Sequence, residues 1–211
     1  MALLADPDRY IEVMQVGRCP LCFLLHDYVH EHLKSLLEES VTDPLSREAL
    51  FRSRGFCNRH AWQGVHQGRH LGMAVIYGSL LEKGLARLSA SPKIWGGPKP
   101  KPCPLCESEK SRDKANLQQF ALSWSESEKL RSAFSERGIL CLNHLEKTLA
   151  QKMSTLRRKN LYETGKKALE LILKDLNEFL GKQDYHRSHE SLGPEKDAWI
   201  RAVRAVSGER E

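Results

Sequence analysis

Apolar residues recur at intervals of three and four along most of the chain, which is the pattern of amphipathic helices. The alternation of apolar and polar residues that marks half-buried strands is scarce, and Leu, Ala, Glu, Lys and Arg are favoured instead. We therefore predict an all-α fold, a helical bundle. The stripes predict helices over residues 23–39, 60–88, 114–122, 128–137 and 144–180.

Breaks in this pattern separate the predicted helices. Asp43 and Pro44 predict a turn, after which a short helix opens at Ser46 and ends near Gly55. Residues 123–125 and Gly138 mark the corresponding breaks further along the chain. Each half thus contains a helical hairpin followed by a long helix.

A Pro- and Gly-rich stretch divides the chain. Its composition forbids regular structure, so we interpret it as a linker. Beyond the second half, Trp199, Ile200, Val203 and Val206 predict a short amphipathic helix that docks on the bundle. The predicted organisation is a first repeat at 1–90, a linker at 91–102, a second repeat at 103–182 and a C-terminal tail at 183–211.

All six cysteines fall into two copies of one motif. The second copy follows the first at a constant offset of 84 residues, which indicates an internal duplication. The first copy is Cys19-Pro20-Leu21-Cys22 with Cys57-Asn58-Arg59-His60, and the second is Cys103-Pro104-Leu105-Cys106 with Cys141-Leu142-Asn143-His144.

Ligands spaced three residues apart can converge on one ion from a turn or the first turn of a helix. Three thiolates and one imidazole form a common structural zinc set. The sequence therefore predicts two zinc ions per chain, held by Cys19, Cys22, Cys57, His60, Cys103, Cys106, Cys141 and His144. A helical hairpin could return each CxxC to the CxxH of its own repeat. Exchange, with Cys19 and Cys22 joining Cys141 and His144, remains open.

Other uses of the cysteines remain open at this point. Cys3His ligation of an iron–sulfur cluster is one alternative, although the compact cysteine run of ferredoxins is missing. A dithiol redox pair at either CPLC is another. Incidental burial is a third.

Histidines also recur at helical spacing outside the duplicated motif. His26 with His30 and His66 with His70 could build a further metal or catalytic site, but solvated helix faces explain them as well. The same holds for His186 and His189 in the tail.

Charge and hydropathy bear on the binding partners and the cellular location of the protein. The net charge is +6, and basic residues within 157–167 leave nucleic-acid binding open, although acidic residues share that predicted helix. No stretch reaches the roughly 20 apolar residues of a membrane span. The early Asp6 and Asp8 do not fit a secretory signal, so we expect a cytoplasmic protein that does not enter the membrane.

The function is expected to be non-enzymatic. The sequence contains no Gly-rich phosphate loop, GxSxG elbow or HExxH motif. Closed metal sites favour a metal-stabilised binding or adaptor module with a protein partner, in an oligomeric state that the sequence leaves open. A redox or electron-transfer protein is the alternative, and an enzyme built on the unpaired histidines is the third class.

The motifs resemble those of an uncharacterised prokaryotic family, domain of unknown function 6062. The resemblance rests on the two CPxC and CxxH pairs, on Asp43-Pro44 with Arg47, and on Asp184-Tyr185 with the later Trp199-Ile200-Arg201-Ala202-Val203. It spans nearly the whole chain and implies the same architecture and ligands, but no activity. Ile139-Leu140 stands in the second half where the first has Gly55-Phe56, which indicates that the halves have diverged.

Overall fold

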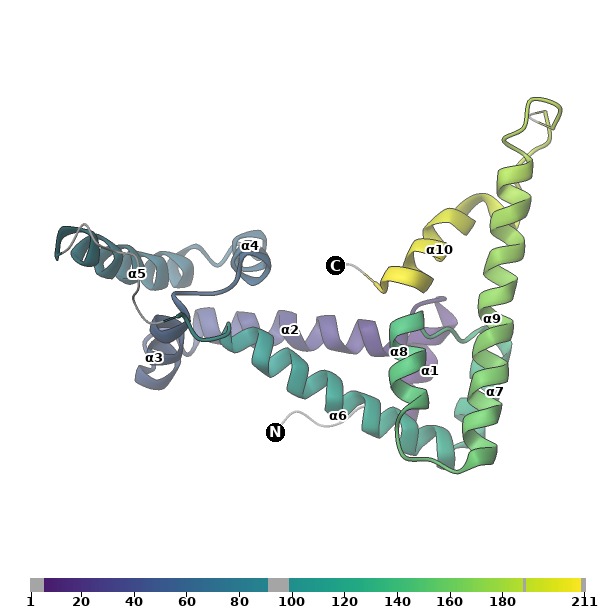
Figure 1. The fold of residues 1–211 in the computed structure, drawn as a ribbon, viewed down its shortest axis with the longest axis horizontal. Helices are drawn as coiled ribbons and strands as arrows, with labels where there is room; N and C mark the ends of the chain where they lie inside the picture. Colours follow the sequence, from purple (N-terminus) through teal and green to yellow (C-terminus); the bar gives the residue numbers. More distant parts are fainter. Residues whose placement is uncertain (1–5, 91–98, 188, 210–211) are drawn as a thin grey trace. The chain divides into compact units, whose positions relative to one another are not determined.

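The fold is all-α, as predicted. The structure is a computed structural model that describes residues 6–90, 99–187 and 189–209 (Figure 1). No strand occurs within these ranges. The elements are α1 (Pro7–Gln15), α2 (Pro20–Glu38), α3 (Pro44–Ser53), α4 (Asn58–His66), α5 (His70–Ala90), α6 (Pro104–Glu126), α7 (Glu128–Arg137), α8 (Leu142–Leu149), α9 (Thr155–Gly181), the 3₁₀ turn η1 (Pro194–Asp197) and α10 (Ala198–Ser207).

The duplication seen in the sequence extends to the helix boundaries. The first residues of α6, α7 and α8 lie 84 positions after those of α2, α3 and α4. N-cap side chains help to define where two of these helices begin. The Asp43 side chain accepts a hydrogen bond from the Ser46 backbone amide at the start of α3, and Ser127 accepts one from the Leu130 amide at the start of α7. The predicted all-α fold with an internal duplication is confirmed.

Each of the two longest predicted helices is in fact two helices. The first is interrupted between α4 and α5, where Gly68 adopts a φ of 69°. The second is interrupted between α8 and α9, where the Ser154 side chain caps the new helix. Apolar spacing of three and four continues across both breaks, which is why periodicity alone did not reveal them.

The predicted break at residues 123–125 is wrong, because α6 continues to Glu126 and already begins at Pro104. The Ser125 hydroxyl donates to the Ala121 carbonyl one turn earlier, so its polar group is satisfied inside the helix. Ser123 is buried. The helix α1 was not predicted from the sequence.

By contacts the chain divides into two units that differ from the sequence repeats. The first unit comprises residues up to His26 and from Asp113 onward, and the second is Asp27–Arg112. Both α2 and α6 therefore contribute residues to each unit. The boundaries proposed from the sequence stay a prediction about repeats.

An aromatic cluster forms the core of the first unit. α1 packs on α7. Tyr10 lies edge-on to Phe120 at 5.0 Å between ring centroids, and Trp124 lies edge-on to Phe134 at 5.3 Å. All four side chains are buried, and the Trp124 indole donates to the Arg157 carbonyl at 3.1 Å. Such rings contribute both buried area and oriented contacts.

Aliphatic side chains form the core of the second unit. Val29, Leu33 and Leu50 are buried there together with Ile76. Gly72 of α5 lies against the α2 backbone, where an added Cβ would stand 2.1 Å from the Leu37 carbonyl oxygen. Only glycine permits this approach.

The C-terminal helix docks through a different face from the one predicted. α10 contacts α9 and α8 through the buried Ala198 and Ala205. Trp199 and Val203, which were expected to pack inward, are more than half exposed. Small residues on the contacting face allow close packing, and the larger apolar ones remain at the surface.

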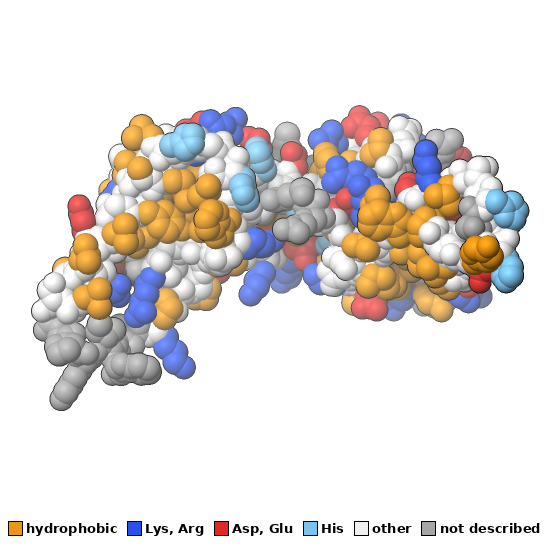
Figure 2. All heavy atoms as spheres, turned by 90° about the horizontal axis from the view of Figure 1, so that it is seen from above, with side chains coloured by type: hydrophobic (Ala, Val, Ile, Leu, Met, Phe, Trp, Pro, Cys, Tyr) orange, Lys and Arg blue, Asp and Glu red, His pale blue; other side chains and the backbone are white. Residues whose placement is uncertain are grey.

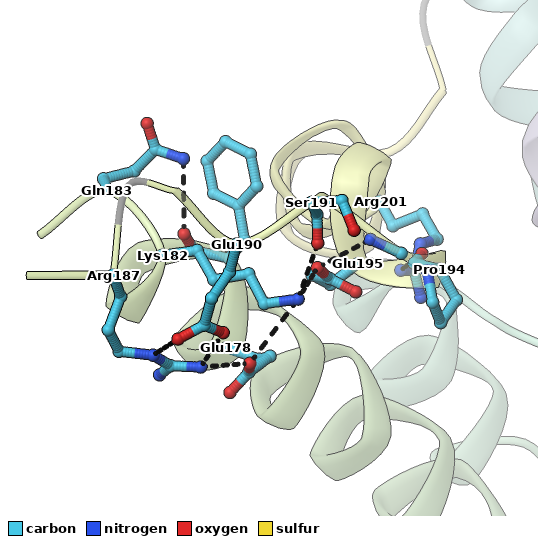
Figure 3. A network of polar contacts seen from close by, with 11 residues as sticks. Glu178, Lys182, Gln183, Arg187, Glu190, Ser191, Pro194, Glu195 and Arg201 are labelled. Atoms are coloured by element: carbon cyan, nitrogen blue, oxygen red, sulfur yellow. Dashed lines mark hydrogen bonds and ion pairs between the residues drawn. The ribbon is translucent and has the colours of Figure 1, made fainter.

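Ion pairs fix the connection between α9 and α10 (Figure 3). Lys182, which directly follows α9, donates to the buried carboxylate of Glu195 at 2.8 Å. This contact, with the Gly193 amide, lowers the pKa of Glu195 to about 2, so the carboxylate is charged at neutral pH. Arg201 of α10 pairs with Asp175 of α9 at 2.9 Å.

In the described part of the chain, each helix is either too short or too polar to cross a membrane.

Candidate metal centres

The first cluster lies in the first unit, where the start of α2 meets the start of α8 (Figure 1). We call it the α2–α8 site: Cys19, Cys22, Cys141 and His144, all buried. The His144 Nδ1 atom lies 3.5, 3.2 and 3.3 Å from the sulfurs of Cys19, Cys22 and Cys141. Cys22 Sγ and Cys141 Sγ are 3.7 Å apart.

The second cluster lies in the second unit, where the starts of α4 and α6 meet. We call it the α4–α6 site: Cys57, His60, Cys103 and Cys106. The His60 Nδ1 atom lies 3.4, 3.6 and 3.5 Å from the three sulfurs in that order. Cys57 Sγ and Cys106 Sγ are 3.6 Å apart.

The structure therefore brings together all eight predicted residues, by exchange between the repeats. The CPxC of the first repeat joins the CxxH of the second, and the reverse holds at the other site. A hairpin that returns each CPxC to the CxxH of its own repeat is not what the structure contains. The exchanged pairing joins segments that are about 120 residues apart in sequence at one site and about 45 apart at the other. Closing loops of this length costs conformational entropy.

Each cluster gathers its ligands at two helix N-termini. Cys57 and Cys141 are the N-cap residues of α4 and α8, and His60 and His144 lie three positions later in the first turn. Cys19 and Cys103 directly precede α2 and α6. Three thiolates around a divalent ion would carry a net charge of about −1, which the positive ends of two helix dipoles would stabilise.

The spacing of the ligand atoms suits a single tetrahedral ion. Zn–S bonds of about 2.3 Å and Zn–N bonds of about 2.0 Å place tetrahedral ligands roughly 3.5–3.8 Å apart. The observed S–S and S–N separations run from 3.2 to 3.7 Å. Both groups could therefore hold a metal ion.

A carboxylate orients the histidine of the α2–α8 site. The Asp113 carboxylate lies 3.1 Å from His144 Nε2 and accepts a second hydrogen bond from Lys147 at 2.9 Å. A carboxylate on Nε2 fixes the ring and keeps Nδ1 directed at the sulfurs, as is usual for histidines that bind metals. Asp113 was not among the site residues predicted from the sequence.

The α4–α6 site has a looser counterpart. Glu109 lies 3.6 Å from His60 Nε2 and is ion-paired with Arg59. Cys57 and Cys106 are only partly buried at this site. The cysteines of this site are thus more accessible to solvent than those of the α2–α8 site.

The two carboxylates are not related by the duplication. Both come from α6, one helical turn apart, and the positions 84 residues earlier are Leu25 and Val29. The duplicated pattern could not indicate these two acids, because the first repeat has no acidic residue at the equivalent positions. The only signal was a pair of acids one turn apart after the second CPxC motif.

Proton binding and metal binding compete at these clusters. Burial raises the pKa of Cys19 well above its ordinary value, and burial raises that of Cys106 to about 12. Burial alone would lower the pKa of His144, but its hydrogen bonds to Asp113 and the cysteines raise it to about 11. Metal ligands must be thiolate or neutral imidazole, so binding displaces these protons and the affinity increases with pH.

Hydrogen bonds within the α2–α8 cluster already favour one thiolate. Contacts with Cys19 and Cys22 hold the pKa of Cys141 far below its ordinary value. Cys141 is therefore in the thiolate form that a metal ligand needs, whereas the pKa of Cys19 is raised by burial.

The C-terminal segment covers the α2–α8 site. Gly208 has a φ of 81°, and a Cβ built there would lie 3.2 Å from Cys22 Sγ. The buried Glu209 carboxylate pairs with Arg18 at 3.3 Å and with Arg204 at 3.5 Å. The segment after α10 thus closes over the sulfurs, and glycine is required at its closest point.

The other predicted histidines do not converge on a third cluster in the described residues. His30 accepts a hydrogen bond from Gln67 at 3.1 Å, and His66 and His70 are exposed. His186 and His189 lie exposed in the connection that precedes η1. These side chains fit the interpretation as solvated surface positions.

The exchange can be tested by mapping disulfides. A double variant, Cys19→Ser with Cys103→Ser, keeps one cysteine in each motif. Mild oxidation after chelator treatment should then link Cys22 to Cys141 and Cys57 to Cys106, because these sulfurs need to approach by less than about 2 Å to reach bonding distance. Peptide mass spectrometry identifies the bonds.

The same variant oxidised in denaturant serves as the control. There, proximity in sequence should favour the bonds between Cys22 and Cys57 and between Cys106 and Cys141. Recovery of these within-repeat bonds from the folded protein would contradict the exchange.

The role of Asp113 can be tested by Asp113→Asn. Loss of the carboxylate should weaken metal binding at the α2–α8 site by about 10- to 100-fold, since His144 loses its charged partner. Chelator competition measures the affinity of each site. Glu109→Gln is the matched variant and should affect only the α4–α6 site. If both variants weakened metal binding equally at both sites, Asp113 and Glu109 would not each serve a single site.

Comparisons with known proteins agree with the duplication. A family described as a family of unknown function, DUF6062, matches residues 12–94 and again 93–211. An uncharacterised 23.9 kDa protein from the xynA 3′ region of Caldicellulosiruptor sp. strain Rt8B.4 is 29% identical over 201 residues, covering 94% of this chain and 98% of that protein. No solved structure matches. The chain is a member of the DUF6062 family, with the family unit present twice.

Proposed function

We propose that this protein is a zinc-stabilised adaptor whose two Cys3His sites hold together a helical scaffold for a protein partner. The observation that carries the metal assignment is the pair of four-ligand clusters with tetrahedral spacing. Cys3His is a frequent ligand set for structural zinc. Metal in such sites contributes about 10–16 kcal/mol of apparent binding free energy in small domains, comparable to the whole stability of a domain.

A structural role follows from the number and burial of the ligands. Four protein side chains complete a tetrahedron, whereas catalytic zinc keeps one position for water or substrate. Six of the eight ligands are buried. The metal would therefore act on stability and on the exchanged topology.

Iron–sulfur or redox chemistry is the second candidate. The close approach of sulfurs at both sites and the partial exposure of Cys57 and Cys106 favour it. Against a cluster, the four ligand atoms of each site lie within 4.8 Å of one another. That spacing suits one ion better than several iron atoms, each with its own ligands.

The end of α5 supplies the support for a protein partner. Leu81, Leu85 and Leu88 recur on one face and are 67%, 62% and 57% exposed. Nearly every residue from 81 to 89 is exposed. Figure 2 shows hydrophobic side chains gathered in patches on the visible surface. An amphipathic helix with an uncovered apolar stripe fits the groove of another protein.

Elemental analysis tests the metal assignment. The purified chain should contain two zinc ions, and Cys57→Ser and Cys141→Ser should each leave one and lower the thermal midpoint. Cys57→Ser should loosen the unit that contains α4 and α5. His66→Ala is the control and should keep both ions. Negligible zinc, or brown protein containing iron, would overturn the zinc proposal.

Charge substitution on the α5 stripe tests the adaptor role. Leu81→Asp combined with Leu85→Asp should leave metal content and thermal midpoint unchanged, because both side chains are exposed. It should reduce recovery of co-purifying protein from the native host by about tenfold, since buried hydrophobic anchors dominate such interfaces. Hydrogen exchange over residues 81–89 should slow in the complex.

The matched control is Leu156→Asp on α9, a leucine that is 74% exposed. It should retain the partner. Equal recovery with the stripe variant and the wild type would exclude α5 as the binding surface. Light scattering distinguishes a second copy of this chain from a different partner.

A further inference from the structure

A cavity of about 440 Å³ is lined by residues of the first unit, whereas the α5 stripe belongs to the second unit. α9 and α10 form two of its sides, and the end of α7 with the segments before α2 and α8 form the others. This volume falls within the range of small-molecule sites in proteins, about 300–1,000 Å³. The proposed adaptor role makes no use of it.

The walls of the cavity are mainly apolar. Phe134, Ile139 and Ile172 line it, and Ala168 of α9 leaves room where a larger side chain would fill it. The ligand residues Cys19 and Cys141 form part of its inner wall, so an occupant would lie beside the α2–α8 site. An apolar body of a small molecule fits these walls.

Some charged side chains that line the cavity have a polar or oppositely charged partner, and others have none. Arg201 is paired with Asp175, and Glu209 is shared between Arg18 and Arg204. Glu170 lies 3.7 Å from Lys166, and Glu136 is near the Ser132 hydroxyl.

Two lysines at the cavity have no such partner. Lys167 and Lys174 lie seven residues apart on one face of α9, with Leu171 between them. Neither makes an ion pair or hydrogen bond to another described residue. Two unmatched ammonium groups at the edge of an apolar cavity favour an occupant with a negative end.

We infer that this cavity binds a small organic acid, with its apolar body between α7, α9 and α10 and its carboxylate at Lys167 and Lys174. Such a molecule buries its hydrocarbon part against the walls and leaves the charged group at the solvent-facing edge. The internal pairs of Arg201 and Arg204 remain intact.

Isothermal titration calorimetry on the full chain tests this inference with three probes that share one chain length. Decanoate, decanol and decyltrimethylammonium are used below the concentrations at which they self-associate. Decanoate should bind with one site per chain, decanol about tenfold more weakly, and the cation without measurable affinity, because only the acid meets the lysines.

Substitutions locate the site. Ala168→Trp should reduce decanoate affinity by at least about tenfold by filling the cavity. Leu171→Glu, at a side chain that is 59% exposed and tolerant of change, should do the same by repelling the carboxylate. Lys174→Glu should weaken decanoate and not decanol. Lys159→Glu, on α9 outside the cavity, is the control and should change neither.

Several outcomes would overturn the inference. Absence of decanoate binding removes it directly. Equal binding of all three probes, or decanol binding as tightly as decanoate, shows apolar adsorption without selection for an acid. Unchanged decanoate affinity in both Leu171→Glu and Ala168→Trp places the binding elsewhere. Metal content does not enter these readouts, so the inference and the zinc proposal fail independently.

Discussion

The meeting of two helix N-termini at each Cys3His cluster is the constraint on which the rest of this structure depends. α2 meets α8 at one cluster and α4 meets α6 at the other, and each helix start brings two ligands. The local dipoles stabilise thiolate charge, and the short distances among sulfurs and imidazole would be costly without a shared ion. In the observed pairing, each cluster takes its four residues from both repeats.

The helix α6 has a role that its duplicated counterpart α2 lacks. It begins with two ligands of the α4–α6 site and carries Glu109 beside that site, while Asp113, one turn later, holds the histidine of the other. The environments of the sites differ accordingly. The α2–α8 site is buried and covered by Gly208, whereas two of the sulfurs at the α4–α6 site remain partly exposed. Duplication preserved the ligands, and divergence changed what surrounds them.

Features outside the clusters divide between the two units. The second unit presents an uncovered leucine stripe at the end of α5, and the first contains a cavity with unmatched lysines on α9. The cavity reaches Cys19 and Cys141, and the segment after α10 that closes over the same cluster also contributes Glu209 to the cavity wall. The cavity and the α2–α8 site thus share wall residues.

The sequence by itself determined the helical class, the eight candidate ligand residues and their constant 84-residue register. These follow from local spacing, because ligands three residues apart share one turn whatever the rest of the chain does. It did not determine which CPxC joins which CxxH, because Cys22 can reach Cys57 or Cys141 with the same local geometry. The tertiary structure decided that pairing, and with it the role of Asp113, which depends on where α6 passes. The tertiary structure also decided which face of α10 is buried: Ala198 and Ala205 pack inward, and Trp199 stays exposed. Sequence periodicity marks an apolar face but does not identify the helix on which that face packs.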